Sequence, residues 1–200
     1  MKPGPRLTVA TAALLLGLVY LFPLWQIALK APQYPEGLGL RIWVNRITGA
    51  APQDLASINS LNHYIGMKRI EPDDIPELRF MPWIVLGLIT SGLLVALLSR
   101  RGLLKAWVAL MVLVALVGLA DFWKWGYDYG HKLAPDAIIS IPGMTYQPPL
   151  IGSKQLLNFS ATSWPGPGGW AIIGALLLGV VALRISLLAP RAESASGVIE

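Results

Sequence analysis

The run M-P-W-I-V-L-G-L-I-T-S-G-L-L-V-A-L-L, from Met81 to Leu98, decides the fold of this chain together with the sequence that follows it. Ser99-Arg-Arg-Gly102 interrupts the apolar sequence, and a second run extends from Ala106 to Ala120. Because an α-helix rises ~1.5 Å per residue, runs of this kind approach the ~30 Å thickness of the hydrocarbon core of a bilayer. A connection this short makes the two helices antiparallel neighbours. The sequence therefore predicts a helical hairpin in a membrane.

Two further apolar runs lie near the ends of the chain. The first, Leu7–Leu29, follows a short basic stub, and the other extends from Trp170 to Leu188. A basic stub before an apolar run also begins a signal peptide. This run, however, is longer than the apolar region of a typical signal, and Ala28–Ala31 is a poor cleavage site. We expect an uncleaved first membrane helix.

The composition is that of a membrane protein without cysteine chemistry. Of the 200 residues, 54% are hydrophobic and 14% are charged, whereas about a quarter of the residues of a soluble domain are charged. The absence of cysteine excludes disulfide bonds, thiolate metal sites and thiol catalysis. A soft metal ion would therefore need methionine or histidine ligands.

The four apolar runs predict a mainly α membrane protein in which four transmembrane helices carry two polar segments. The predicted order is a stub with the first transmembrane helix (1–29), a first periplasmic segment (30–80), the second and third transmembrane helices with a short cytoplasmic loop (81–120), a second periplasmic segment (121–168), a fourth transmembrane helix (169–189) and a cytoplasmic tail (190–200). Because neither segment has enough apolar residues for a core of its own, we expect both to fold together as a small α+β head.

The basic residues predict how the chain lies in the membrane. The stub, the loop from Ser99 to Lys105 and the carboxyl-terminal end hold seven lysines or arginines, whereas the nine in the two long segments are balanced by nine acidic residues. Since positive charge gathers in short cytoplasmic loops, we expect a multi-pass protein of the bacterial inner membrane with both termini in the cytoplasm. The lipid bilayer then accounts for the net charge of +5, because its inner surface is anionic. A nucleic-acid partner is not expected.

Alternation and helical spacing predict the local structure of the head. Apolar residues alternate with polar or aromatic ones from Leu40 to Val44, which is the period of a half-buried strand. Asp54 is a plausible N-cap for a helix that ends at Gly66. A second short strand is expected at Ala137–Ile141, in the same layer as the first.

The polar segments contain four candidate ligands for a soft metal ion, which are His63, Met67, His131 and Met144. His63 and Met67 are four residues apart, about one helical turn, and Met144 follows a Pro-Gly turn. Copper(I) favours thioether and imidazole ligands, and we expect His63 and Met67 to converge with Met144 or His131 on a copper ion. The alternative is that the methionines fill gaps in a small core and that the histidines are structural or solvated.

A harder metal site is a further alternative. Asp121, Asp128 and Asp136 lie in the same segment as His131, and these side chains together would suit zinc or copper(II). Interfacial anchoring by the aromatic residues around them explains the same stretch equally well.

No motif of a known catalytic site is present. The sequence lacks H-E-x-x-H, G-x-S-x-G, the phosphate-binding G-x-x-x-x-G-K and the haem-attachment C-x-x-C-H. The apolar runs also lack the ionisable residues that a proton or ion pathway needs. We therefore expect a protein that is not an enzyme.

Two strings in the polar segments resemble a family of small bacterial inner-membrane proteins. They are L-N-H-Y-I-G-M-K, from Leu61 to Lys68, and P-G-M-T-Y-Q-P-P-L-I-G-S-K-Q-L-L-N-F, from Pro142 to Phe159. The resemblance extends from Tyr34 to about Trp170, and the family is associated with gene clusters for copper handling and for the accessory proteins of nitrous oxide reductase. It implies copper handling, or maturation of a respiratory enzyme, as the setting, and it gives no ligand set of its own.

Two classes of function fit these observations. The first is a membrane-anchored protein that binds copper or helps to assemble a copper enzyme, with a periplasmic or membrane copper enzyme or a copper chaperone as its partner. The second is a non-catalytic structural subunit or scaffold of a membrane respiratory complex, since exposed aromatic and Pro-rich loops suit a protein interface. A third class, an enzymatic or quinone-binding membrane subunit, has no motif in the sequence.

Overall fold

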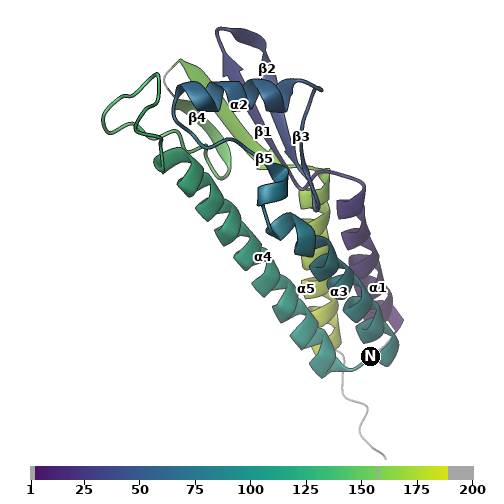
Figure 1. Ribbon diagram of the computed structural model, residues 1–200. Coiled ribbons are helices and arrows are strands. Elements are labelled where there is room, and N and C mark those ends of the chain that lie inside the picture. Colours follow the sequence, from purple (N-terminus) through teal and green to yellow (C-terminus); the bar gives the residue numbers. More distant parts are fainter. Residues whose placement is uncertain (1–2, 157, 189–200) are drawn as a thin grey trace, which may run out of the picture.

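The computed structural model describes residues 3–156 and 158–188. Four long helices form a bundle, and a β-sheet with one further helix lies at one end of it (Figure 1). The bundle contains α1 (Pro3–Leu15), which continues as the 3-10 helix η1 (Leu16–Tyr20), α3 (Glu77–Leu98), α4 (Arg101–His131) and α5 (Pro167–Leu188). The sheet contains β1 (Trp25–Ala31), β2 (Tyr34–Ile42), β3 (Ile47–Gly49), β4 (Gly152–Leu156) and β5 (Phe159–Pro165), and it packs against α2 (Asp54–Tyr64), which the short 3-10 helix η2 (Pro72–Asp74) follows. We call the sheet, α2 and the segment 132–151 the head.

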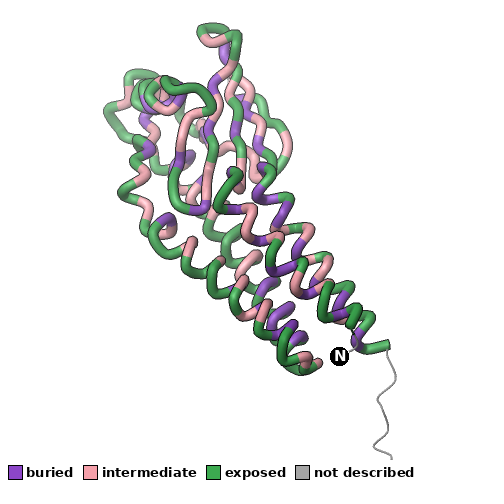
Figure 2. Tube along the Cα trace, turned by 90° about the vertical axis from the view of Figure 1, so that its right-hand side faces the viewer, coloured by how far each residue is buried: buried purple, intermediate pink, exposed green. Residues whose placement is uncertain are grey.

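The predicted helical hairpin is confirmed. α3 ends at Leu98, and Ser99 takes a left-handed conformation, with φ 57°, that turns the chain into α4. Buried residues gather where the helices face each other, and exposed residues cover the outside of the bundle (Figure 2). By length and composition, four helices of the described residues suit crossing a membrane, and these are Pro3–Tyr20, α3, α4 and α5.

A tryptophan fixes the closest approach within the bundle. Trp107 of α4 is buried, and its Nε1 donates a hydrogen bond to the carbonyl oxygen of Leu88 in α3 at 2.9 Å. A Cβ added to Gly92 of α3 would lie 2.6 Å from a carbon of this ring, and one added to Gly179 of α5 would lie 3.3 Å from another. The two glycines therefore let α3 and α5 pack directly against the indole, as small residues do between membrane helices.

The sheet joins the two polar segments of the chain. Its strand order is β3-β2-β1-β5-β4, and all neighbouring strands are antiparallel. β1 is central because it pairs with β2 on one side and with β5, from the other end of the chain, on its other side. The two segments therefore fold together, as predicted. The sheet is larger than predicted, and it makes the chain a mixed α and β protein rather than a mainly α one.

The predicted first helix, Leu7–Leu29, is wrong in its second half. The helical structure ends at Tyr20, and Trp25–Ala31 forms the central strand β1. Pro23 lies between the two elements and cannot continue the helical hydrogen bonds. Buried and exposed side chains alternate along β1, with Ile27 on the buried side. The hydrogen bonds that stabilise this strand come from β2 and β5, and an apolar run does not reveal such distant partners.

Three further boundaries differ from the prediction. The strand expected over Leu40–Val44 is the end of β2, which stops at Ile42. No strand forms at Ala137–Ile141. The strands of the second segment are β4 and β5 instead. The third long helix does not stop at Ala120 but continues to His131, since aromatic residues of its last turns pack against the core of the head.

The helix predicted in the first polar segment is confirmed as α2. Gly66, just beyond its end, has φ 76°, a conformation that glycine adopts without the strain of a Cβ. The N–H of Met67 donates to the carbonyl oxygen of Asn62 at 2.8 Å, and the N–H of Gly66 donates to that of His63 at 3.4 Å. These bonds form a Schellman motif, which ends the helix where the sequence predicts it.

Candidate functional site

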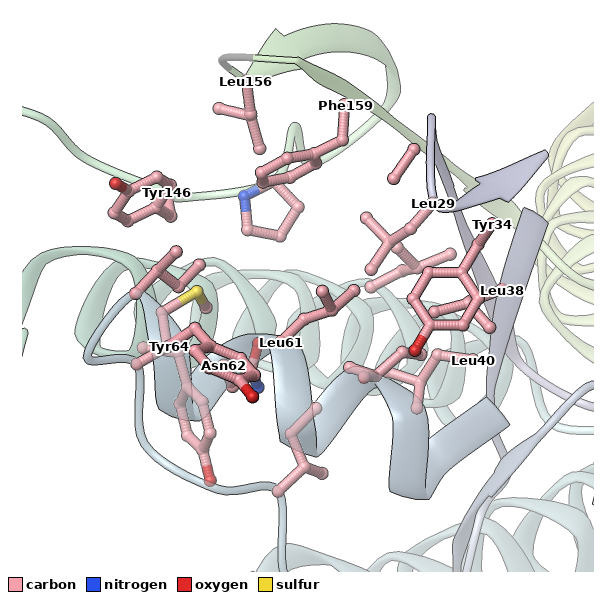
Figure 3. Close-up of a pocket in the computed structure, with 18 of the residues that line it drawn as sticks. Leu29, Tyr34, Leu38, Leu40, Leu61, Asn62, Tyr64, Tyr146, Leu156 and Phe159 are labelled. Carbon is pink, nitrogen blue, oxygen red and sulfur yellow. The ribbon is translucent and has the colours of Figure 1, made fainter. Parts of the chain in front are cut away.

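A cavity of about 380 Å³ lies inside the head, between the sheet and α2. Figure 3 shows Tyr146, Leu156 and Phe159, from the second polar segment, on one side of the cavity and Leu61 and Asn62, from α2, on the other. The remaining walls come from β1, β2 and the last turns of α4, and they include Ile27, Leu29, Leu38, Leu40, Trp125, Gly126 and Tyr129. A largely apolar cavity of this volume is typical of a small-molecule binding site.

Side chains of β1 and β2 make one wall of the cavity. Ile27 is opposite Leu40 in the antiparallel register, and Leu29 is opposite Leu38. Because side chains two residues apart on a strand point to the same face, these four residues form one apolar patch facing α2. Ile27, Leu38 and Leu40 also belong to the buried core of the head.

Asp54 attaches α2 to this wall. It is the first residue of the helix rather than its predicted N-cap, and it is buried. Its Oδ2 accepts hydrogen bonds from the backbone N–H groups of Gly39 in β2, at 2.8 Å, and of Ala51, at 3.0 Å. A Cβ on Gly39 would overlap the Cβ of Ala50, whose N–H donates to the carbonyl oxygen of Gly39 at 2.8 Å. The glycine therefore lets the chain that leads into α2 lie against the strand.

Asn59 holds the chain after α2 against the helix. Its Nδ2 donates to the carbonyl oxygen of Ile70 at 3.1 Å, and its Oδ1 accepts from the N–H of Ile70 at 2.8 Å. Both bonds are buried. The pair fixes Ile70, which lines the cavity. Asn59 is therefore a structural residue of the cavity wall.

Three backbone hydrogen bonds attach the segment 132–151 to the two helices. They run from the N–H of Ala134 to the oxygen of Gly66 (2.8 Å), from the N–H of Ile139 to that of Tyr64 (2.8 Å) and from the N–H of Tyr146 to that of Gly130 (3.0 Å). A Cβ on Gly130 would overlap the backbone of Gln147. Because the backbone around Ile139 bonds to the end of α2, it forms no strand and instead closes the cavity.

The polar groups of the cavity are few and uncharged. Among the described residues, no Asp, Glu, Lys, Arg or His lines it. The amide of Asn62 donates to the carbonyl oxygen of Lys68, and the hydroxyl of Tyr129 donates to that of Arg69. Tyr146 differs from both, because its side chain is 2% exposed and its hydroxyl has no hydrogen-bond partner within the described part of the chain. The hydroxyl of Tyr146 lies at the end of the ring away from the cavity (Figure 3). The cavity suits an uncharged apolar molecule.

Two of the four predicted metal ligands lie together. His63 is exposed, Met67 is half-buried, and both line a shallow groove on the outer side of α2. Asn59, Ser60 and Arg69 line the same groove, and Met67 also lines the cavity. His63 and Met67 thus share one groove, and their convergence on a metal ion stays a prediction.

The other two predicted ligands lie elsewhere. The ring of His131 stacks on that of Tyr127, with 3.9 Å between the ring centres, and its Nδ1 is 3.0 Å from the carbonyl oxygen of Tyr127. Met144 is half-buried in a turn, where its N–H donates to the oxygen of Ile141 at 3.1 Å. Neither residue lines the groove of His63 and Met67. A copper site built from all these residues stays a prediction.

The alternative harder metal site gains no support from the geometry. Asp128 forms ion pairs with Lys124 at 3.2 Å and with Lys132 at 2.7 Å. Across residues 3–156 and 158–188, no group of three or more His, Cys, Asp or Glu side chains is placed to hold a metal ion. Asp128 therefore pairs with lysines of its own helix end.

The cavity was not predicted from the sequence, although two features of the sequence bear on it. Apolar side chains alternate through Trp25–Ala31, which indicates a strand, and Tyr146 lies within the stretch Pro142–Phe159.

Comparisons of the chain with family models, with curated proteins and with solved structures find no match. The geometry of the head is therefore what indicates a function.

Proposed function

We propose that this protein is a membrane-anchored, non-catalytic binding protein whose head takes up an uncharged apolar small molecule. The observation that carries the proposal is the apolar cavity of about 380 Å³, around which no described residue is charged. Apolar walls exclude water from such a ligand and supply most of the binding free energy. They favour an uncharged ligand, because burying an unpaired charge is costly.

The bundle is the membrane anchor in this proposal, with four spans in the bacterial inner membrane, both termini in the cytoplasm and the head in the periplasm. The dimensions support it. Thirteen α-helical residues of α1 and five 3-10 residues of η1 rise about 30 Å together, which equals the hydrocarbon thickness. The first span can therefore end at Tyr20 and still leave Trp25–Ala31 for the sheet.

A displacement assay tests ligand binding directly. An uncharged fluorescent naphthylamine probe is added to the purified protein in a mild detergent, and its fluorescence is compared between wild type, Leu61→Trp and Ser60→Trp. Leu61 lines the cavity, whereas Ser60 is exposed on the outer side of the same helix. Leu61→Trp fills part of the cavity and should lose probe binding, while Ser60→Trp should retain it. Equal binding by all three proteins would place the probe outside the cavity and refute the proposal.

Copper binding or assembly of a copper enzyme is the second candidate function. Its support is that His63 and Met67 line one groove, and the resemblance to the copper-associated family points the same way. A periplasmic or membrane copper enzyme, or a copper chaperone, would be the partner. Arg69 lines the groove too, and its guanidinium pairs with the carboxylate of Glu71 at 2.6 Å.

The copper candidate has its own test. Purified protein is incubated with copper(I) under reducing conditions, and retained copper is measured after gel filtration. Replacing His63 and Met67 together by alanine should abolish retention, whereas His131→Ala should leave it unchanged if the groove alone binds the ion. Equal retention by wild type and the double variant would exclude this groove as the site.

A further inference from the structure

The middle of α4 is exposed on every side within the described structure. Its buried residues lie near its two ends, up to Met111 and again from Gly126. Between them, Leu116 to Asp121 are all exposed, and consecutive residues of an α-helix are rotated by about 100°. Six exposed residues in a row therefore cover all faces of the helix. Figure 1 shows the corresponding course of α4, which diverges from α3 and α5 on its way to the head. We call residues 116–121 the strut.

A glycine lies on the inner face of the strut. Gly118 lies seven residues after Met111 and four before Phe122, and these spacings place all three on one helix face. Nothing lies within 4 Å of a Cβ added to Gly118. The strut and the rest of the bundle therefore bound an opening that the described protein atoms do not fill.

The cavity of the head lies directly above this opening. α4 has 31 residues and α3 has 22, so they are about 46 Å and 33 Å long. α3 ends and α4 begins at the turn around Ser99. α4 consequently extends about 13 Å beyond the other end of α3, at the head. Trp125, Gly126 and Tyr129, which line the cavity, lie on this extension. In a bilayer they would be at the level of the lipid head groups.

Aromatic rings connect the strut with the cavity. Phe122 follows the strut, and its ring centre is 5.2 Å from that of Trp25 in β1 and 6.4 Å from that of Trp125. The ring centre of Trp125 in turn is 4.3 Å from that of Tyr129. An apolar surface thus continues along one face of α4, from the opening to the cavity wall.

We infer that the ligand is an uncharged single-chain lipid, which enters sideways from the bilayer between α4 and the other helices of the bundle and places its head in the cavity. The inference rests on the proposed function and names its ligand class and its route. A phosphate or carboxylate head is excluded because no described residue that lines the cavity is charged and burying an unpaired charge is costly. Fatty alcohols, isoprenoid alcohols and isoprenoid quinones share the required chemistry, which is a long apolar chain with an uncharged head.

Photolabelling in lipid nanodiscs tests both parts of the inference. Three diazirine probes are compared: hexadecanol, which dissolves in the bilayer, hexanol, which reaches the head through water, and hexadecane sulfonate, which is permanently anionic. Mass spectrometry then maps the labelled residues. Wild type is compared with Gly118→Phe, which fills the opening, and with Ala120→Phe, which adds the same side chain on the opposite face of the strut.

The expected result has a distinct pattern. Hexadecanol labels cavity residues such as Leu61 and Tyr146, and strut residues, in wild type and in Ala120→Phe. It loses the cavity adducts in Gly118→Phe. Hexanol labels the cavity in all three proteins, and the sulfonate labels it in none. Competition by unlabelled isoprenoid alcohol, isoprenoid quinone and fatty alcohol then identifies the head group that binds best.

Each contrary result overturns a separate part. Cavity labelling by hexadecanol that is unchanged in Gly118→Phe refutes the sideways route and leaves the proposed function intact. Labelling by the sulfonate as strong as by hexadecanol refutes the uncharged class. A strut without adducts in wild type means that another protein helix fills the opening, which refutes entry of a lipid there. Absence of cavity labelling by every probe, hexanol included, refutes the proposed function itself.

Discussion

Tyr146 is a residue of the cavity wall whose side chain costs the head stability. Its backbone N–H donates to the carbonyl oxygen of Gly130, so the position of the residue is set by the fold, yet its hydroxyl is buried without a partner in the described structure. A buried polar group without a partner costs about 1–3 kcal/mol. Because the hydroxyl points away from the cavity (Figure 3), a ligand in the cavity does not offset this cost.

Tyr146→Phe should therefore stabilise the head and leave ligand binding unchanged. In the ligand-free protein, the variant should unfold at a higher temperature than wild type, because it removes a buried group that costs about 1–3 kcal/mol. Its affinity for alcohols should equal that of wild type, since the hydroxyl does not face the cavity. Tyr20→Phe is the matched control, since the hydroxyl of Tyr20 donates to the carbonyl oxygen of Pro82 at 2.6 Å. The control should lower the melting temperature in detergent, and a fall in both variants would contradict the role given to Tyr146.

Asn59→Ala should weaken the head through the chain that follows α2. It removes two buried hydrogen bonds and leaves the N–H and carbonyl oxygen of Ile70 unpaired, a loss of about 2–4 kcal/mol. Ser60→Ala, at the next, exposed position, is the control and should change little. Hydrogen exchange of the amide of Ile70 measures the effect locally. Protection of that amide equal to wild type would show that other contacts hold this segment.

At the level of single elements, the sequence predicts those whose signals are local. α2, its end at Gly66, and the hairpin of α3 and α4 are each specified by neighbouring residues, and all three are confirmed. β1 is different, because Trp25–Ala31 continues an apolar run and is made a strand by pairing with β2 and β5. β5 lies over a hundred residues away in sequence. The cavity depends on that sheet, and for this reason the sequence could not place its lining residues.

The same reasoning applies to the predicted metal site. The four-residue spacing around the end of α2 brings His63 and Met67 to one groove, because helix geometry is local. Whether His131 or Met144 reaches that groove depends on how the second segment docks. That docking is set by three backbone hydrogen bonds and by the space at Gly130. Backbone contacts of this kind leave no pattern in the side chains of a single sequence.

Gly92→Ala should loosen the packing of α3 on α4. The added methyl group would lie 2.6 Å from a ring carbon of Trp107 and 2.9 Å from the Cβ of Ala13, and overpacking of this kind costs about 1–3 kcal/mol. Gly87→Ala is the control in the same helix, since nothing lies within 4 Å of its added Cβ. Thermal unfolding in detergent should show a lower melting temperature for Gly92→Ala alone. A rise or no change in that variant would mean that the indole can move aside without cost.

At the scale of the whole molecule, the sheet and the bundle constrain each other. β1 follows the first helix directly, and β5 precedes α5, so the pairing of β1 with β5 requires the first and last helices to meet the head at the same end of the bundle. α1 and α5 indeed pack against each other. With four helices that alternate in direction, the start of α1 and the end of α5 then lie at the end of the bundle opposite the head (Figure 1). Arg6 lies at that end as well, because its Nε donates to the carbonyl oxygen of Ala96 near the end of α3, and so do the basic residues of the loop at Ser99.

This arrangement predicts the outcome of a topology experiment. Alkaline phosphatase, which is active only after export, should be inactive when fused after Glu200 or after Arg101 and active when inserted after Ala51. The physical reason is that the seven basic residues at the ends and in the short loop favour the cytoplasmic side, while the sheet holds Ala51 at the other side. A cytoplasmic reporter such as green fluorescent protein at the same three positions should give the reverse pattern, which controls for misfolded fusions. Phosphatase activity after Glu200 but not after Arg101 would refute the even number of spans. Activity after both Glu200 and Arg101 would invert the molecule and place the head, with its cavity, in the cytoplasm.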